Sequence, residues 1–159
     1  MNITVISVGK IKEKFFEDAI KEYAKRLSKY CKFNEEAVAD ERADDGFSKL
    51  EIEQVKLKEG SRILNRIKQN TYVIILDVKG IQLTSEEFAK KINTLGIDGY
   101  SDITFIIGGS NGLSNDVINR GDFCMSFSKM TFPHQLFKII LMEQIYRAFK
   151  INSNEAYHK

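Results

Sequence analysis

The chain has 159 residues, a length that suits one domain. Its 24 basic and 22 acidic side chains nearly balance, which excludes a strongly basic nucleic-acid arm but not a local basic patch. Two distant cysteines without a CxxC spacing and only two histidines argue against a disulfide framework or a metal site. No apolar run approaches the ~20 residues of a membrane span, and the N-terminus is too polar for a signal peptide. We therefore expect a cytoplasmic protein without membrane contact.

The predicted elements alternate between strands and helices. Residues 2–8 are β-branched and end at Gly9, which indicates a strand, and residues 13–30 carry apolar side chains at helical spacing. The later segments are predicted as an irregular strand at 31–39, a loop at 39–46, a charged helix at 48–68, a buried strand at 71–77 ending at Lys79-Gly80, a helix at 85–95 capped by Thr84 or Ser85, a buried strand at 102–107, a short helix from Ser114, a strand at 122–127, a loop at 128–132 and a helix at 133–150. This order predicts one α/β domain over residues 1–159, with a mostly parallel sheet flanked by helices.

A glycine-rich loop at residues 108–112 directly follows one of the buried strands. Ligands of open α/β sheets bind beyond the carboxyl ends of the strands, and glycine lets a ligand approach the backbone closely. The GGxxG spacing matches neither the dinucleotide fingerprint nor a phosphate-binding P-loop. Two interpretations stay open: a cradle for a nucleotide-like ligand, or a tight turn without one.

The segment SFSKMTFPH at 126–134 places a histidine at the start of a helix. Pro133 suits a first helical turn because its missing N–H needs no partner there. His134 then lies beside the positive end of the helix dipole, which favours the neutral ring. A neutral imidazole at a strand end is suited to act as a general base. The alternative is a histidine that only packs against the loop or hydrogen-bonds to it.

Two features of the C-terminal region point to a partner. The helix at 133–150 has almost no polar face, so it is either the central helix of a monomer or a dimer interface, and we favour the interface. The last residues, Tyr157, His158 and Lys159, combine a stacking ring, a titratable ring and a cation. Those groups suit an RNA-contacting or catalytic tail, although many chain ends of this composition only fray.

Taken together, the motifs resemble a known family. The segments that carry the resemblance are LDVKG at 76–80, FIIGGSNG at 105–112, SFSKMTFPHQL at 126–136, EQIYRAFKI at 143–151 and EAYHK at 155–159. With the chain length and the first strand ending in VGK, they are similar to the SPOUT-class methyltransferase H family of the large ribosomal subunit. The resemblance covers essentially the whole chain. Each motif alone is weak, but GGxxG, SxxTFPH and a C-terminal YH are specific in combination.

The resemblance implies a reaction and an architecture. Such proteins transfer a methyl group from S-adenosyl-L-methionine, without a metal, to N3 of a pseudouridine in helix 69 of 23S rRNA. They act on the assembled ribosome as homodimers, and their α/β sheet carries a trefoil knot near the C-terminus. General topology rules disfavour knots, so this expectation comes from the resemblance alone.

The resemblance also implies a binding site for the methyl donor. The expected contacts are Leu76, Gly108, Phe127, Ser128, Lys129, Met130, Thr131 and Phe132, mostly through their backbone. These positions coincide with the three strand ends considered above. A glycine is expected at 108 because a side chain there would crowd the ligand.

The groups expected to act on the RNA lie at the two ends of the last helix and in the tail. His134 or His158 would act as base or orienting group, and Tyr157 would position or stack the target base. Arg147 and Lys159 would hold phosphate or the uracil oxygen. Because the tail would reach the second subunit's donor pocket, each active site would be composite.

The small net charge suits a protein that docks on a ribosome through shape and a few cations. Lys10, Lys12 and Lys14 are candidates for RNA contact, or simply form a solvated helix start.

Three other functions compete with this interpretation. The same fold could methylate tRNA or another rRNA site, although the YH tail favours the pseudouridine enzyme. A non-catalytic nucleotide-binding module would not need His134 or the YH end, and a purely structural dimer would not explain the glycine loop.

Overall fold

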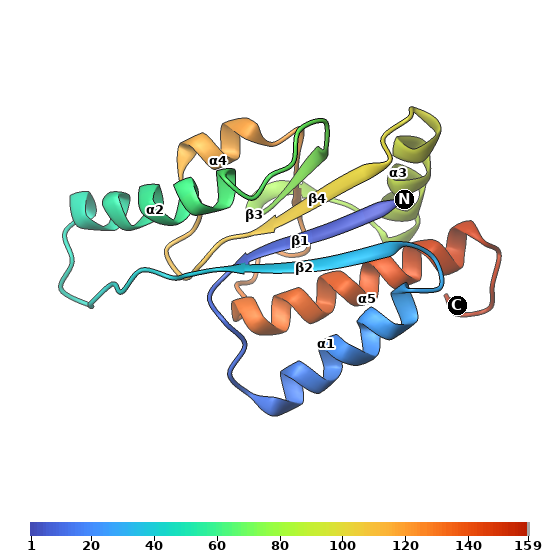
Figure 1. The fold of residues 1–159 in the computed structure, drawn as a ribbon, viewed down its shortest axis with the longest axis horizontal. Coiled ribbons are helices and arrows are strands. Elements are labelled where there is room, and N and C mark those ends of the chain that lie inside the picture. Colours follow the sequence, from blue (N-terminus) through green and yellow to red (C-terminus); the bar gives the residue numbers. More distant parts are fainter. Residues whose placement is uncertain (159) are drawn as a thin grey trace.

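The structure is a computed structural model that describes residues 1–158. Within these residues five strands alternate with five helices (Figure 1). The strands are β1 (Asn2–Val8), β2 (Lys32–Val38), β3 (Tyr72–Gln82), β4 (Asp102–Ile107) and β5 (Phe123–Ser126). The helices are α1 (Lys14–Leu27), α2 (Lys49–Leu64), α3 (Ser85–Ile97), α4 (Asn115–Arg120) and α5 (His134–Asn152). Lys159, a predicted RNA or base contact, lies outside the described residues.

The strands form one parallel sheet in the order β2-β1-β4-β3-β5. Helices α1, α3 and α5 pack on one face and α2 and α4 on the other (Figure 1). Side chains of β1 alternate between the two cores: Ile3 and Val5 face α1 and α5, whereas Ile6 and Val8 face α2. The predicted α/β architecture with a parallel sheet is confirmed. The trefoil knot stays a prediction.

One predicted strand end is wrong. β3 does not stop at Lys79-Gly80 but resumes its pairing, because Leu76 and Ile81 both register with Met125 of β5. Residues 77–80 therefore bulge out between two paired stretches. A Cβ added at Gly80 would lie only 2.5 Å from the backbone carbonyl carbon of Met125, so the close approach of β5 requires glycine here. Tertiary pairing, which local sequence does not encode, extends the strand.

The helix starts follow local rules more closely. Thr84 accepts a hydrogen bond from the backbone N–H of Glu87, whose carboxylate accepts from the N–H of Thr84, so Thr84 is the cap of α3. Ser48 and Glu51 form the same capping box at α2. His134 lies in the first turn of α5, as predicted, although the helix begins at His134 and the predicted first residue, Pro133, is its N-cap.

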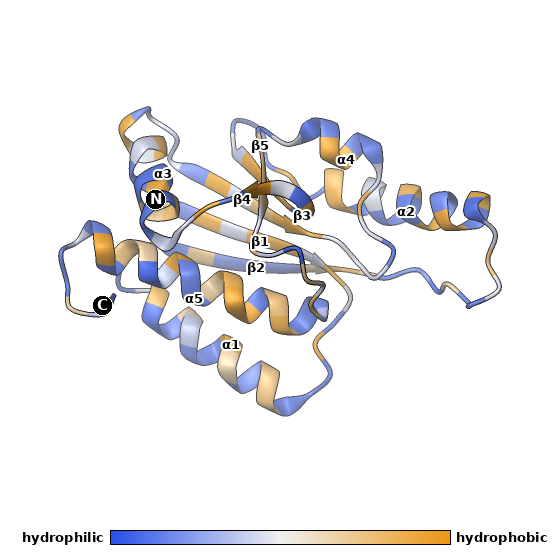
Figure 2. Ribbon diagram, turned by 180° about the vertical axis from the view of Figure 1, so that it is seen from behind, coloured by the Kyte–Doolittle hydropathy of each residue, from blue (hydrophilic) through white to orange (hydrophobic). Residues whose placement is uncertain are grey.

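Helix α5 lies on the sheet between α1 and α3 (Figure 2). Its fully buried residues are Lys138, Leu141, Met142, Ile145 and Ala148. The expectation of almost no polar face is wrong, because a half-buried stripe carries Glu143, Gln144 and Arg147. Within one chain, the remaining large apolar side chains of α5 are half-buried, apart from Leu136, which is the one exposed large apolar side chain within residues 134–152. No helix in residues 1–158 has both the length and the apolar character needed to cross a membrane.

Candidate active site

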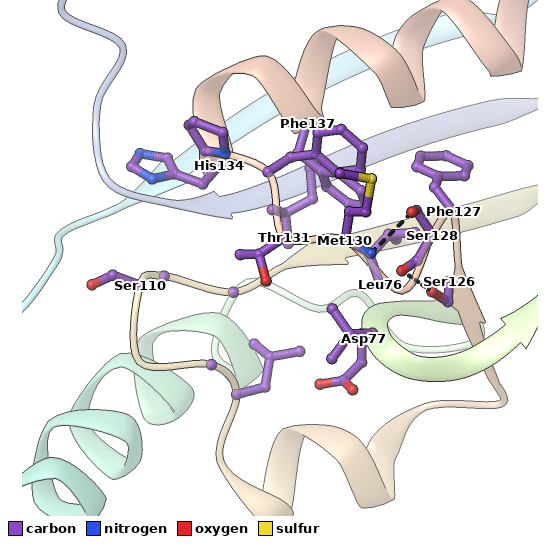
Figure 3. Close-up of a pocket in the computed structure, with 18 of the residues that line it drawn as sticks. Leu76, Asp77, Ser110, Ser126, Phe127, Ser128, Met130, Thr131, His134 and Phe137 are labelled. Atoms are coloured by element: carbon purple, nitrogen blue, oxygen red, sulfur yellow. Dashed lines mark hydrogen bonds between the residues drawn. The ribbon is translucent and has the colours of Figure 1, made fainter.

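A cavity of about 650 Å³ opens at the carboxyl ends of β4 and β5, beside the bulge in the middle of β3 (Figure 3). Three segments wall it: residues 76–78 of β3, the loop after β4, and the loop between β5 and α5. The lining residues are Leu76, Asp77, Val78, Ile107, 108–113, 126–128, 130–134 and Phe137. The predicted donor contacts lie together here except for Lys129, whose side chain is exposed and does not line the cavity.

The glycine loop (residues 108–112) is closed by its own backbone. The N–H of Gly112 donates to the carbonyl of Gly109 over 3.0 Å, and Gly112 has a φ of +82°, which favours glycine. A Cβ added at Gly108 would lie 2.9 Å from Cγ of Leu113. The reason expected for glycine at 108 is therefore incomplete, because the loop's own packing already excludes a side chain there.

Two residues of α2 support this loop from behind. Glu59 is buried, and its Oε1 accepts a hydrogen bond from the backbone N–H of Glu41. Its Oε2 has no hydrogen-bond partner within residues 1–158 and faces Gly109. Burial raises the pKa of Glu59. Next to it, a Cβ on Gly60 would lie 2.2 Å from Oγ of Ser114, so glycine there lets α2 approach the end of the loop.

Sequence reasoning missed Glu59. It lies one helical turn from Val55 on one side and from Ile63 on the other, in the apolar stripe of α2. A carboxylate at a stripe position was the signal that could have found it, because buried acids need an explanation.

The loop between β5 and α5 forms a wall of backbone and aromatic rings. Ser126 Oγ donates to the carbonyl of Ser128 over 2.9 Å, and Ser128 Oγ accepts from the N–H of Met130 over 3.0 Å. The ring of Phe137 packs against Phe127 and Phe132, with centroid distances of 5.1 and 6.2 Å. These contacts hold an apolar surface and ordered backbone groups at the cavity, as a site that binds through its main chain requires.

His134 lies at the rim of the same cavity. Its ring packs against the turn after β1, where a Cβ on Gly9 would lie 3.3 Å from Nε2. The backbone N–H of Lys12 donates to Oε1 of Gln135 over 3.2 Å. This contact brings the turn that carries the exposed Lys10 and Lys12 against the start of α5, next to the cavity.

The other predicted catalytic residues gather at the opposite end of α5. We call this group the tail cluster, formed by Glu86, Glu143, Arg147, Tyr157 and His158. The guanidinium of Arg147 donates to Oε1 of Glu143 over 2.6 and 3.0 Å and lies 4.7 Å from the ring centroid of Tyr157. The hydroxyl of Tyr157 donates to the same carboxylate over 3.1 Å. The hydrogen bond to Glu143 raises the pKa of Arg147, and burial followed by Glu143 raises the pKa of Tyr157.

The tail is held by further contacts and does not fray. His158 lies between Arg147 and Glu86, with nitrogen–nitrogen and nitrogen–oxygen distances of 3.3 and 2.7 Å. Glu155 pairs with Lys150 over 2.5 Å and accepts from the hydroxyl of Tyr30 over 3.0 Å. The bond to Lys150 holds the pKa of Glu155 below its usual range.

The structure therefore brings the predicted site residues together in two groups. His134 and the predicted donor contacts lie around the first turn of α5, and the tail cluster lies along its second half, from Glu143 onward. At 1.5 Å per residue, His134 and Arg147 are about 20 Å apart along the helix. Within one chain the two groups do not meet.

Comparison with known proteins identifies the family. Residues 1–158 match the family model described as "Predicted SPOUT methyltransferase". The chain belongs to the SPOUT methyltransferases. Its similar relatives include the ribosomal RNA large subunit methyltransferase H 1 of Clostridium perfringens strain SM101, at 57% identity. The enzymes named ribosomal RNA large subunit methyltransferase H of Clostridium beijerinckii and Clostridium kluyveri are 56% and 54% identical, and all three alignments cover both chains completely.

A solved structure shares the SPOUT chain's fold. It is described as a probable methylase family protein from Haemophilus influenzae, with a TM-score of 0.50 and 11% sequence identity. The match covers 99% of this chain and 70% of the other. At this identity the match concerns the fold alone.

Proposed function

We propose that the chain methylates 23S rRNA in the large ribosomal subunit, at N3 of a pseudouridine in helix 69. Its methyl donor is S-adenosyl-L-methionine, and it acts in the cytoplasm on the assembled ribosome, as a homodimer. Identity of 54–57% over the full length to relatives named for large-subunit rRNA methylation carries this proposal. The order of the glycine loop, the SxxTFPH segment and the YH tail supports the pseudouridine enzyme.

The cavity suits the donor. Its volume falls within the range of small-molecule sites, and its walls combine apolar side chains with backbone groups at strand ends. Leu76, Gly108 and the segment 127–132 would hold the donor, with the rings of Phe127 and Phe132 against the flat adenine. When bound, S-adenosyl-L-methionine supplies a methyl group already activated by a positively charged sulfur.

The chain's own residues must then align the target base and remove one proton. The N3–H of pseudouridine is mostly protonated at neutral pH, so a general base next to the donor promotes the reaction. His134 is the histidine that the chain places at the donor cavity, and His158 is the one in the tail cluster. Arg147 offers a fixed cation for the negative charge that develops on the base, and Tyr157 offers a ring to stack on it.

The distance between the two groups supports a homodimer. Within one chain, His134 at the donor cavity and Arg147 of the tail cluster are about 20 Å apart along α5, yet the proposed chemistry needs the two groups together. In a two-fold dimer the same surface serves both subunits. Packing across the outward side of α5, which includes Leu136, would bring the tail cluster of each chain to the cavity of the other and give two composite sites.

Docking on the ribosome accounts for the small net charge. The turn with Lys10 and Lys12 lies beside the cavity, where a few cations would meet RNA phosphates. We therefore expect weak binding to an isolated helix 69 and much higher activity on intact ribosomes. Equal turnover on the isolated fragment would contradict docking on the assembled particle.

The direct test follows a labelled methyl group from S-adenosyl-L-methionine to ribosomes that lack this modification. Nuclease digestion and mass spectrometry then locate the label. Label on N3 of a pseudouridine in helix 69 is the expected result. A dimer that binds the donor but leaves ribosomes unlabelled would overturn the rRNA substrate, and label on tRNA in a parallel reaction would support the alternative substrate.

A further inference from the structure

The donor cavity has an unbalanced set of charges. Asp77 is the one residue lining it that carries a fixed charge, since its lining includes no lysine or arginine. His134 is its other titratable residue, at the rim. Two nearby lysines have exposed side chains outside the lining: Lys79, two residues after Asp77, and Lys129. An otherwise neutral cavity with one carboxylate favours a positively charged ligand over a neutral one.

Local structure fixes the position of this carboxylate. Asp77 follows Leu76 at the point where β3 leaves its pairing with β5, and Oδ1 accepts a hydrogen bond from the backbone N–H of Lys79 over 2.8 Å. Within residues 1–158 the hydrogen bonding of Asp77 uses Oδ1, which leaves Oδ2 for a ligand or water. Figure 3 shows the side chain at the cavity among the residues that line it.

We propose that Asp77 determines the charge specificity of the donor pocket, by favouring the positively charged sulfonium donor over its neutral thioether product. The proposal rests on the proposed function, because it takes S-adenosyl-L-methionine as the donor. Methyl transfer removes the positive charge from sulfur: N3 of the target base gives up its proton to the general base and forms a bond to the methyl carbon, while the carbon–sulfur bond breaks and its electron pair stays on sulfur. The attraction of Asp77 for the ligand therefore weakens as the product forms, and this helps product release.

The test measures binding rather than turnover. Isothermal titration calorimetry of the full chain with S-adenosyl-L-methionine and with S-adenosyl-L-homocysteine gives both dissociation constants. Asp77→Asn keeps the acceptor for the N–H of Lys79 and removes only the charge. Asp18→Asn, an exposed residue of α1, is the control with the same change in net charge.

We expect Asp77→Asn to weaken binding of the sulfonium donor about five- to tenfold, as for the loss of one partly screened charge. Binding of the thioether should change less than twofold, and Asp18→Asn should change neither. Raising the salt concentration should reduce the difference between the two ligands in the natural chain.

Three results would overturn the proposal. Equal weakening of both ligands would show that Asp77 only maintains the shape of the pocket, and unchanged binding of both would exclude any role. In either case the proposed methyl donor stands, because the natural chain still binds it. A natural chain that binds neither ligand would overturn the proposed donor, and the charge specificity with it.

Discussion

The two ends of α5 are built in different ways. At its first turn, strand ends, the glycine loop and the loop at 126–133 form the donor cavity, largely from backbone and apolar side chains. Near its last turn, the tail cluster depends on side-chain hydrogen bonds around Glu143 and Arg147. The first is a property of the fold of one chain. The second gathers the charged and aromatic groups that we propose act on a substrate, and in the proposed homodimer each chain brings this cluster to the cavity of the other.

Filling the cavity should have the largest effect. Thr131 is exposed and lines the cavity, so Thr131→Trp places an indole in the donor site without disturbing the core. We expect donor affinity and turnover to fall at least about 100-fold, with a melting temperature close to that of the natural chain. Thr94→Trp, at an exposed position of α3, is the control. Unchanged donor binding by Thr131→Trp would show that the donor binds elsewhere.

A change in the tail cluster should separate turnover from donor binding. Arg147→Ala removes the cation next to Tyr157 and His158, and we expect turnover to fall about 100-fold, the size of one lost electrostatic group. Donor affinity should stay within about twofold, because the proposed donor contacts are Leu76, Gly108 and the segment 127–132, whereas the proposed role of Arg147 is toward the target base. Arg120→Ala, another partly exposed arginine with an acidic partner, is the control. A loss of donor affinity equal to the loss of turnover would contradict the separation of the two groups.

Each of the two regions contains one histidine: His134 lies at the cavity and His158 in the tail cluster. His134→Ala and His158→Ala, assayed separately, should show which one supplies the base, with a loss of about 10- to 100-fold in turnover for that variant. If both variants keep full turnover, neither histidine acts in the reaction.

The smallest expected effect is on the thermal stability of the chain, through Glu59, which packs behind the glycine loop. Burial raises the pKa of Glu59, so as pH rises through the usual glutamate range the unfolded chain loses its proton first. Ionisation therefore lowers the free energy of unfolding of the natural chain, and Glu59→Gln removes this loss. At pH 7 we expect the melting temperature of Glu59→Gln to be about 2–4 °C above that of the natural chain, which corresponds to ~1 kcal/mol in the free energy of unfolding. Near pH 4 this difference in melting temperature should disappear. A gap that is independent of pH would mean that the titration of Glu59 does not contribute.

Sequence periodicity and capping rules predicted the helices and strands of this chain well, because those features depend on neighbours along the chain. The site residues Gly108 and His134 followed from strand ends and a helix start in the same way. The pairing of β3 beyond Gly80 could not be predicted, because it depends on how closely Met125 approaches. The placement of Asp77 in the lining of the cavity and of Glu59 behind the glycine loop also depends on contacts between segments that are distant in sequence.

The organisation of the tail cluster also escaped prediction. Its sequence resembles that of many frayed chain ends, and its order arises from Glu143 of α5 and Glu86 of α3. Single residues could be singled out from their chemistry, but their grouping into two distant clusters required the three-dimensional structure. That grouping is the reason to expect that one chain cannot form the complete site.

A mixed dimer tests this central claim most directly. Thr131→Trp and Arg147→Ala chains are co-expressed with different tags, the mixed dimer is purified, and methyl transfer to unmodified ribosomes is measured. If each site combines the cavity of one chain with the tail cluster of the other, one of the two sites contains neither change, and activity should return to about half that of the natural dimer. If each chain uses its own tail, both sites are damaged, and a mixed dimer as inactive as the two parent variants would contradict the account.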